Sequence, residues 1–398
     1  FYNNVPDNYN SAASFTHLAA PSPPPPLPPP PYPPPPAHPS DVYSNATLAA
    51  AVEWLLSFDA AGLIARLHLS AGHYVLAATV DLGKSLASAI YVTSTSDATV
   101  TTSSAACVFT TGSTTLLHVE GITFYSSLCL YGGHATVRNA AFYNIDTWSS
   151  SALIVRNEAA VEVSHTAFIG NQVYSSGGAI TVEGGRLVLF DCRILENAAG
   201  VNGGAIMVNG GQLEAFVTLI ERNHAAQDGG ALMVASGSVL LANETLLLSN
   251  TASGKPSSVF IGSGSVTYQL PAPLGRWVLT DGRGTTSALS QGATSSDFPY
   301  PCSPGIVGST FDVSAQSGPQ CSGLCPPGDF CPANTSQPRL CPMGHFCAEA
   351  SPAASPCTVG TWSNVTGLKA ESECNNCPAG HACALASAMP TACLPGSF

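Results

Sequence analysis

Residues 177–202 read GGAITVEGGRLVLFDCRILENAAGVN, and residues 203–228 read GGAIMVNGGQLEAFVTLIERNHAAQD. A third version, GGALMVASGSVLLANETLLLSNTASGKP, fills residues 229–256. A unit of 26 residues cannot bury its own apolar face, so successive copies must stack and bury that face against one another. The repeat therefore predicts a solenoid.

Apolar residues alternate with polar ones within each copy, and this period of two is that of a β-strand. A fourth copy, without the glycine pair, begins at Ser151. When the four copies are aligned, equivalent residues form columns, as the stacked strands of a parallel β-helix require. The alignment predicts three inward columns, which are Val161, Leu187, Leu213 and Val239, then Val163, Leu189, Ala215 and Leu241, and then Phe168, Ile194, Ile220 and Leu246.

Recurrent glycines and asparagines mark the expected corners between strands. Asparagine tolerates left-handed backbone geometry and can hydrogen-bond along a stack, while glycine fits where a Cβ atom would clash. Asn250 belongs to the same series but comes one place late. We expect the corner residues to be Gly177, Gly178, Gly203, Gly204, Gly229, Gly230, Asn171, Asn197 and Asn223.

The paired signals GGA[IL] and [FIL]-x-x-N resemble the repeats of polymorphic outer membrane proteins and other pectin-lyase-like right-handed β-helices. The resemblance implies an all-β fold in which residues 73–270 form a right-handed parallel β-helix. The earlier coils depart from the pattern, because Phe124 and Phe142 keep its apolar character while Asn144 is out of register. The autotransporter barrel of the bacterial family is absent, so the membrane anchoring of that family does not carry over.

Both ends of the solenoid need a cover, because an open end is a template for edge pairing. Residues 41–72 are expected to hold a cap helix and the entry to the first coil. Prolines in YQLPAPLGRWVL, residues 268–279, should stop the stack, and residues 271–320 should connect it to the next module. The cap helix is predicted from four apolar residues on one helical face, Leu48, Val52, Leu55 and Leu56.

The N-terminal region divides into an extended tail, residues 1–20, and a proline-rich arm, residues 21–40. The arm contains PSPPPPLPPPPYPPPP, which predicts a stiff polyproline II rod because proline fixes φ and lacks a donor. Its serine-and-proline blocks resemble extensins and other hydroxyproline-rich glycoproteins of plant and green-algal walls; an inert linker is the other interpretation. The resemblance implies hydroxylation or O-glycosylation at Ser22, Pro23, Pro24, Pro25, Pro26, Pro28, Pro29, Pro30, Pro31, Pro33, Pro34, Pro35 and Pro36.

Eleven of the 14 cysteines lie between Cys302 and Cys393. The stretches CPPGDFC, CPMGHFC, CTVGTW, CPAGHAC and CLPGSF resemble the ephrin-receptor-like repeat C-x-x-G-x-[FYW], although Ala382 replaces the aromatic residue in one copy. Loops of this size cannot build a core, so disulfides replace one over residues 321–398. Zinc is the rival use, with His345 and His381 nearby, but both histidines fill a variable slot of the repeat.

The disulfide candidates include one pair outside this module, since Cys107 and Cys129 are expected to pair across neighbouring coils. Cys192 shares a column with Thr166 and Thr218, which predicts a buried free thiol. The last repeat stops before its second cysteine, so we expect the partner of Cys393 to lie beyond the end of this sequence. The candidates are Cys107, Cys129, Cys302, Cys321, Cys325, Cys331, Cys341, Cys347, Cys357, Cys374, Cys377 and Cys383.

Composition limits the compartment and the partners. Twelve scattered Lys and Arg residues and a net charge of -12 argue against nucleic acid, and no apolar run approaches the ~18 residues that spanning a membrane needs. The chain begins with Phe1, so a removed signal peptide or a longer parent protein is expected. The cysteines predict an oxidising, extracellular location, and so do four N-glycosylation sequons, at Asn45, Asn243, Asn334 and Asn364.

Carboxylates do not converge when the coils are aligned, although many right-handed β-helices cleave polysaccharides. Glu162 and Glu214 share a column but are separated by Val188. Asp191 lies above His165, which makes this pair the best acid–base candidate, although an outward polar pair is the simpler interpretation. Glycosidases and calcium-dependent lyases need two or three acids on one groove, so we expect a non-enzymatic protein without a cofactor or a metal.

An outward stripe is the last feature of the alignment. Ile169, Leu195, Glu221 and Leu247 stand beside an inward column and by alternation point outward. Exposed aliphatic residues in a stripe are either covered by the same chain or await a partner, and the alignment leaves both possibilities open.

Together these features predict a secreted structural glycoprotein, a subunit of a mastigoneme-like appendage or of a cell-wall or matrix fibre, and the extensin resemblance implies a green-algal source. We expect it to form an open homo-oligomeric filament through the arm and the β-helix surface. The alternatives are a polysaccharide lyase or hydrolase of the pectin-lyase-like class and a glycan-binding adhesin.

Overall fold

The computed structural model describes residues 42–43, 64–85, 87–103, 107–253, 257–279, 286–288, 292–293, 297–394 and 396. The chain divides into two compact units, Phe1–Pro39 and Ser40–Phe398, and every described residue belongs to the second. The expected tail, the proline-rich arm, the cap helix and Asn45 therefore lie outside the described residues.

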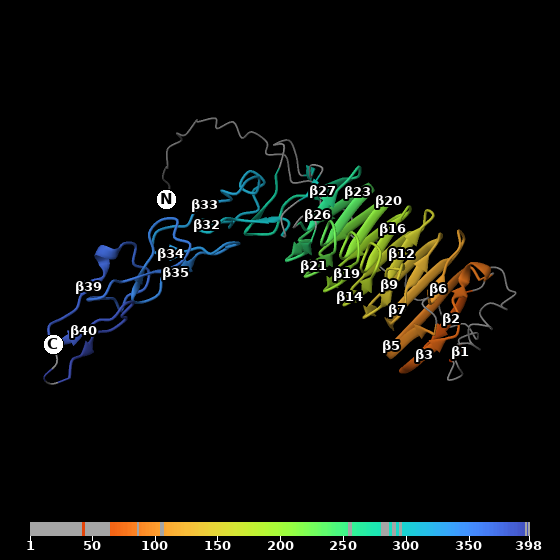
Figure 1. The fold of residues 1–398 in the computed structure, drawn as a ribbon, viewed down its shortest axis with the longest axis horizontal. Coiled ribbons are helices and arrows are strands. Elements are labelled where there is room, and N and C mark those ends of the chain that lie inside the picture. The colour runs from red at the N-terminus through yellow and green to blue at the C-terminus, as the bar shows by residue number, and fades with distance from the viewer. Residues whose placement is uncertain are drawn as a thin grey trace, which may run out of the picture. The chain divides into compact units, whose positions relative to one another are not determined.

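Parallel strands wind into a β-solenoid of about eight turns, as the 26-residue repeat predicts (Figure 1). Three ladders of stacked strands form its faces, and several long strands pass from one face to the next. The first ladder consists of β4 (Val80–Asp81), β6 (Phe109–Thr110), β8 (Leu128–Leu130), β12 (Leu153–Arg156), β16 (Ile180–Glu183), the first part of β20 (Ile206–Phe216), the first part of β23 (Leu232–Ala242) and β26 (Val259–Ile261).

The second ladder begins earlier than the predicted boundary at residue 73, because residues 64–68 already pair in parallel with the next coil. It consists of β1 (Val42–Tyr43), β2 (Ile64–His68), β5 (Ala89–Thr102), β7 (Leu116–Phe124), β9 (His134–Arg138), β13 (Ala160–Ser164), β17 (Arg186–Phe190), the second parts of β20 and β23, and β27 (Ser265–Gln269).

A third ladder and a short fourth one complete each turn. The third consists of β3 (Gly72–Leu76), the second parts of β5 and β7, β10 (Ala141–Tyr143), β14 (Ala167–Ile169), β18 (Arg193–Leu195), β21 (Leu219–Glu221) and β24 (Leu246–Leu248). The fourth consists of β11 (Asp146–Thr147), β15 (Gln172–Val173), β19 (Ala198–Ala199), β22 (His224–Ala225) and β25 (Thr251–Ala252). One short 3-10 helix, η1 (Leu82–Lys84), lies among the first coils.

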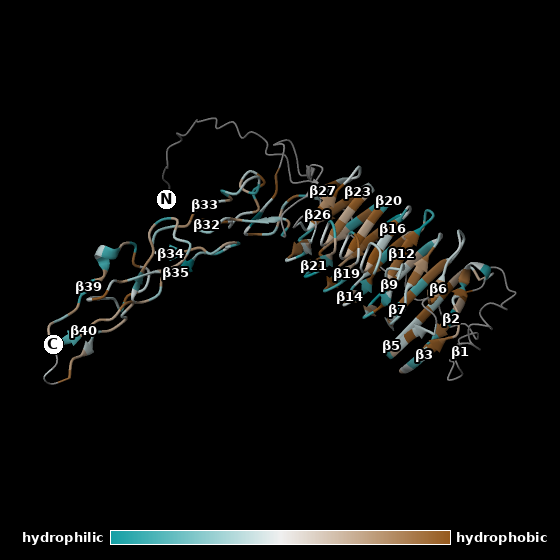
Figure 2. Ribbon diagram, in the orientation of Figure 1, coloured by the Kyte–Doolittle hydropathy of each residue, from teal (hydrophilic) through white to brown (hydrophobic). Residues whose placement is uncertain are grey.

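Like residues stack inside the solenoid, whose strands carry many hydrophobic residues along their length (Figure 2). The rings of Phe124, Phe142 and Phe168 lie face to face, with centroids 4.9 and 4.7 Å apart. Ile194 and Ile220 continue this column, and all five side chains are buried. The alternating pattern of the sequence therefore places its apolar set on the inner face of each strand.

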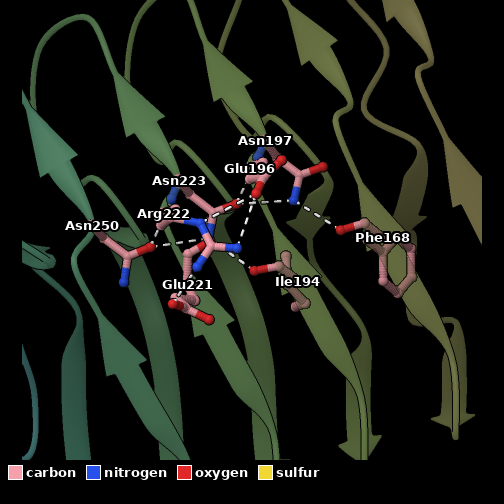
Figure 3. A network of polar contacts seen from close by, with 8 residues as sticks. All are labelled: Phe168, Ile194, Glu196, Asn197, Glu221, Arg222, Asn223 and Asn250. Atoms are coloured by element: carbon pink, nitrogen blue, oxygen red, sulfur yellow. Dashed lines mark hydrogen bonds and ion pairs between the residues drawn. The ribbon is translucent and has the colours of Figure 1, made fainter.

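The corner asparagines form a buried hydrogen-bonded ladder (Figure 3). The Nδ2 group of Asn171 donates to Oδ1 of Asn197 at 2.8 Å, Asn197 donates in the same way to Asn223 at 2.9 Å, and Asn223 donates to Asn250 at 2.9 Å. Each Oδ1 also accepts the backbone N–H of the asparagine one coil earlier, and each Nδ2 also reaches a carbonyl of the preceding coil, such as that of Phe168. The four carboxamides are almost completely buried, so these bonds satisfy groups that water cannot reach.

Glycine pairs form another corner, where the next coil passes too close for a side chain. Gly177, Gly203 and Gly229 have positive φ angles of 76°, 64° and 68°. A Cβ atom at Gly204 would lie 2.2 Å from the carbonyl oxygen of Gly230. Each pair therefore needs glycine at both positions, one for the left-handed backbone and one for the close approach.

The third inward column differs from the alignment at its last member. Leu247, not Leu246, pairs with Ile220 and is fully buried, while Leu246 pairs with Leu219 and is half-buried. The prediction was wrong by one residue because Glu244 is an additional residue at the preceding corner. The same addition explains why Asn250 comes one place late and still joins the ladder.

Antiparallel strands cover the last coil. β29 (Thr286–Ala288) pairs with β27, and β30 (Gly292–Ala293) pairs with β26. Phe298 bridges to Leu247 and packs its buried ring against Tyr268 at 5.5 Å. Within the range 271–320, which the sequence suggests only as a connection, β29, β30 and Phe298 therefore also close the open edge of the stack.

Disulfides take the place of a core after residue 301. Small antiparallel pairs follow one another in this part of the chain, and the first of them begins at residue 276. They are β28 (Arg276–Trp277) with β31 (Tyr300–Pro301), β32 (Ile306–Val307) with β33 (Gly323–Leu324), β34 (Asp329–Phe330) with β35 (Arg339–Leu340), β36 (His345–Phe346) with β37 (Ser355–Pro356), β38 (Thr361–Trp362) with β39 (Asn375–Asn376), and β40 (His381–Ala382) with β41 (Thr391–Ala392). One 3-10 helix, η2 (Glu371–Glu373), precedes β39. The twelve candidate cysteines form six disulfides: Cys107–Cys129, Cys302–Cys321, Cys325–Cys331, Cys341–Cys347, Cys357–Cys374 and Cys377–Cys383.

Successive cysteine repeats are joined through the glycine of C-x-x-G. The amide of Gly344 donates to Ser363 in the following repeat, and its carbonyl accepts the amide of Cys357 at 2.8 Å. Gly328 and Gly360 make the same pair of bonds, and all three glycines have positive φ. The backbone thus links each repeat to the next, in addition to the disulfide within it.

Removing one rung of the asparagine ladder tests its contribution. Asn197→Ala deprives the N–H and Nδ2 groups of Asn171 of their shared acceptor. Buried donors left without partners each cost roughly 1–3 kcal/mol, so we expect a loss of about 3 kcal/mol in the free energy of opening. Hydrogen exchange at the amides of Asn171 and Asn197 measures it. The exposed Asn209→Ala is the matched control and should change the value by under ~0.5 kcal/mol; equal effects would contradict the ladder's role.

Val217 is a β-branched residue in a left-handed backbone conformation, which such residues disfavour. Its φ is 53°, in a corner column whose other members include Asn139, His165 and Asp191 at 48°, 50° and 50°. A left-handed conformation costs a β-branched residue about 1–2 kcal/mol, so Val217→Asn should stabilise the protein by about 1 kcal/mol. Calorimetric melting measures the gain, and the reciprocal change Asn139→Val should lower the melting temperature. A destabilised Val217→Asn protein would refute this account.

Candidate functional site

The carboxylates of the second ladder remain separate. Glu162 pairs with Val188, which in turn pairs with Glu214, as the alignment predicts. Arg186 donates from Nε and Nη2 to the two oxygens of Glu214, each at 2.9 Å. This bidentate contact raises the pKa of Arg186 and occupies the carboxylate. The column therefore provides an ion pair and not a pair of acids on one substrate.

His165 and Asp191 do come together at a solvent-exposed corner. His165 Nε2 lies 3.5 Å from Asp191 Oδ2, and each side chain is about half exposed, 54% and 53%. The next residues in this corner column are Val217 and Asn243, neither of which is acidic. The pair can exchange a proton, but nothing in its column supplies the second carboxylate that glycoside hydrolysis needs.

Other charged residues on the solenoid are also paired. Arg222 contacts Glu196 at 2.9 Å and also reaches Glu221, as Figure 3 shows. Arg156 lies 2.6 Å from Glu183 of the following coil. Exposed ion pairs of this kind contribute at most about 1 kcal/mol each to the stability of the fold. Their charged groups contact one another and hold no reactive group.

His118 makes a polar contact with Glu120 that the sequence did not predict. Its ring packs against Tyr91 at 5.1 Å, and its Nε2 lies 3.4 Å from Glu120. Burial lowers its pKa from the ordinary value, against the opposing effect of the Glu120 carboxylate. The residue carries no repeat signal, because the coils before Ser151 do not follow the 26-residue register closely. Glu120 is the carboxylate beside His118, so the contact brings one acid to the imidazole and not the two that glycoside hydrolysis needs.

Metal ligands do not gather in the part of the chain that the structure describes, where no group of three His, Cys, Asp or Glu residues could hold an ion. The histidines weighed for zinc contact backbone carbonyls, His345 that of Met343 and His381 that of Ala379. The neighbouring cysteines are held in disulfides. Within the same described ranges, no helix is long and apolar enough to cross a membrane.

The outward stripe shifts with the corrected register. Leu248, not Leu247, pairs with Glu221 and takes the outward place, because Glu244 displaces this strand by one residue. Leu195 is only 6% exposed in the isolated chain, so its own chain covers it. Ile169 and Leu248 are half-buried. The stripe is therefore mostly covered and presents no broad apolar surface.

Trp148 and Tyr174 form an exposed aromatic pair at the fourth ladder, which the sequence reasoning also missed. Their rings stack with centroids 4.5 Å apart and an interplanar angle of 24°. Trp148 is 77% exposed and Tyr174 48% exposed. The two residues are 26 positions apart, so the repeat length itself could have found them. The pair places two large rings side by side at the surface of neighbouring coils.

The three sequons within the described residues are accessible. Asn243, Asn334 and Asn364 are all exposed, and Asn243 and Asn334 lie in turns with positive φ. The glycosylation candidates Asn45, Ser22 and the arm prolines lie outside the described residues.

No protein-family model, curated protein or solved structure matches this chain.

Cys192 and Cys393 carry free thiols that should react differently. Burial raises the pKa of Cys192 to about 12, so roughly one thiol in ten thousand is ionised at pH 8. Iodoacetamide at pH 8 should therefore modify half-exposed Cys393 at least about a hundredfold faster than Cys192, as read by peptide mass spectrometry. Both thiols should react in denaturant, which is the control. Equal rates in the native protein would show that Cys192 is accessible.

Proposed function

We propose that this chain is a secreted, non-enzymatic structural glycoprotein, a subunit of an extracellular filament or surface appendage. The observation that carries the proposal is the continuous stack of about eight coils, joined through the buried asparagine ladder. Two of its charged corner residues, Glu196 and Arg222, form an ion pair. Such a molecule offers a defined shape and little chemistry.

The compartment follows from the cysteines. Six disulfides persist only where the environment is oxidising, which supports secretion. Exposed Asn243, Asn334 and Asn364 support N-glycosylation in the secretory pathway. Attached glycans would be compatible with this surface, because all three positions point to solvent.

The source and the kind of assembly rest on the sequence resemblances. The solenoid repeats are similar to those of polymorphic outer membrane proteins and pectin-lyase-like β-helices, and the C-terminal repeats are similar to those of ephrin receptors. The proline-rich arm is similar to extensins, which points to a green-algal wall, matrix fibre or mastigoneme-like appendage. We infer that the arm of one subunit reaches a neighbouring subunit, and that head-to-tail repetition gives an open filament.

Deleting residues 1–40 tests the assembly. The deletion ends one residue beyond the first compact unit, Phe1–Pro39. The shortened protein should keep its β-helix, seen as a retained β-sheet signal in far-ultraviolet circular dichroism after the polyproline II signal of the arm is lost, but should form no fibres under negative-stain electron microscopy. Fibres of normal appearance from the shortened chain would refute the role of the arm.

Incubation with acidic polysaccharides separates the alternatives. Cleavage would favour a lyase or hydrolase, for which His165 and Asp191 are the best available pair. Retention without cleavage would favour a glycan-binding adhesin, for which exposed Trp148 and Tyr174 are the relevant surface. Neither cleavage nor retention is the result expected for a fibre subunit.

A further inference from the structure

One outward column, directly after the strands of the fourth ladder, carries two exposed aromatic side chains. It contains Trp148, Tyr174, Gly200 and Ala226, one residue from each of four successive coils, and all four are exposed. Backbone bonds fix their register: the amides of Tyr174, Gly200 and Ala226 donate to the coil before at 3.1, 2.8 and 3.0 Å. Two large aromatic residues are thus followed, along one line, by two small ones.

The aromatic part of this column is held in place. Ser150 donates its amide to the hydroxyl of Thr147 at 3.2 Å, which closes the turn that carries Trp148. The stacked ring of Trp148 covers one face of Tyr174. Trp148 remains largely exposed and Tyr174 about half exposed, and exposed aromatic clusters of this kind commonly mark contact sites.

After Tyr174 the column holds no side chain larger than a methyl group, since Gly200 and Ala226 follow on the next two coils. Gly200 follows Tyr174 and must be glycine, because a Cβ atom there would lie 2.4 Å from the carbonyl oxygen of Tyr174. Ala226 adds only a methyl group on the next coil. Together Gly200 and Ala226 form a shelf beside the aromatic pair, two coils long.

The length of this shelf fits one turn of polyproline II. Two coils rise about 9.6 Å at the spacing of neighbouring strands, and three residues of polyproline II rise about 9.3 Å. A proline packed on the ring of Tyr174 would therefore bring the proline three places later over Ala226. Prolines commonly dock on exposed aromatic rings, and the Trp148 indole N–H and the Tyr174 hydroxyl are suitable donors for their free carbonyls.

Charge also favours this occupant. Thirteen of the sixteen residues 21–36 are proline, and none is charged. The column next to the shelf contains Asp146, Gln172, Ala198, His224 and Thr251, with one carboxylate and no Lys or Arg. An acidic polysaccharide would find no fixed positive charge in these two columns, whereas an uncharged proline helix needs none.

We propose that Trp148, Tyr174 and the shelf of Gly200 and Ala226 are the site that receives the proline-rich arm, residues 21–36, of a neighbouring subunit. This inference rests on the proposed filament function and names the receiving surface. The exposed part of Tyr174 packs against a proline ring, and the shelf accommodates the next turn of the arm. The contact uses apolar area and two hydrogen-bond donors, so it should vary little with ionic strength.

Variants of the full chain test the site. Replacing both rings, Trp148→Ala with Tyr174→Ala, should slow fibre growth at least about tenfold in light scattering, since buried aromatic anchors dominate contacts of this kind. Ala226→Arg fills the shelf without touching the rings and should have a similar effect, which keeps the test valid if the double variant fails to fold. Tyr125→Ala removes a 43% exposed ring of the third ladder and should leave growth unchanged.

A photo-cross-linker replacing Leu27 locates the contact directly. In fibres grown from a mixture of isotope-labelled and unlabelled chains, it should join the arm of one copy to a peptide containing Tyr174 or Gly200 of another. Normal growth of the site variants, while the chain lacking residues 1–40 forms no fibres, would overturn this site and keep the proposed function. Fibres from that shortened chain would overturn both. Cross-links within one copy only, or loss of neutral-polysaccharide binding with normal growth, would also overturn the inference.

Discussion

Each buried asparagine of the corner ladder needs partners from the coils on both sides, because its carboxamide has no access to water. Asn197 accepts from Asn171 with one oxygen and donates to Asn223 with its nitrogen, so a coil that slipped by one residue would leave several buried groups unpaired. The apolar columns alone do not impose this, since leucine, isoleucine and phenylalanine substitute for one another along them. The ladder therefore fixes the register in which the remaining side chains pack.

The sequence predicts the solenoid well from residue 151 onward, because the repeat length, the strand period and the corner residues agree there. It fails by one residue at Leu247, where an additional corner residue shifts the strand and no local pattern marks the shift. It gives no sign that residues 286–288 and 292–293 pair with the last coil, since antiparallel edge strands carry no 26-residue signal. The alignment stacks Glu196 on Arg222 and so predicts their ion pair, but the other arginine–glutamate pairs and the exposed aromatic pair were found only from the structure.

Function in this molecule rests on shape more than on reactive groups. Glu183, Glu196 and Glu214 contact arginines, and the pair of His165 with Asp191 has no second carboxylate in its column. The C-terminal repeats replace a core with disulfides and join one another through backbone bonds at Gly328, Gly344 and Gly360. Both modules thus propagate by repetition, each contacting mainly the unit before and the unit after it.

The additional residue Glu244 shows where such a protein can change. It lengthens one coil, yet Leu247 and Asn250 return to their columns, because the turn between Asn243 and Thr245 takes up the extra length. The same turn presents Asn243 to solvent as an Asn-Glu-Thr triplet. Surface decoration can therefore be gained or lost by small insertions at the corners while the packed interior stays as it is, so that the exterior and the interior of the chain are free to evolve separately.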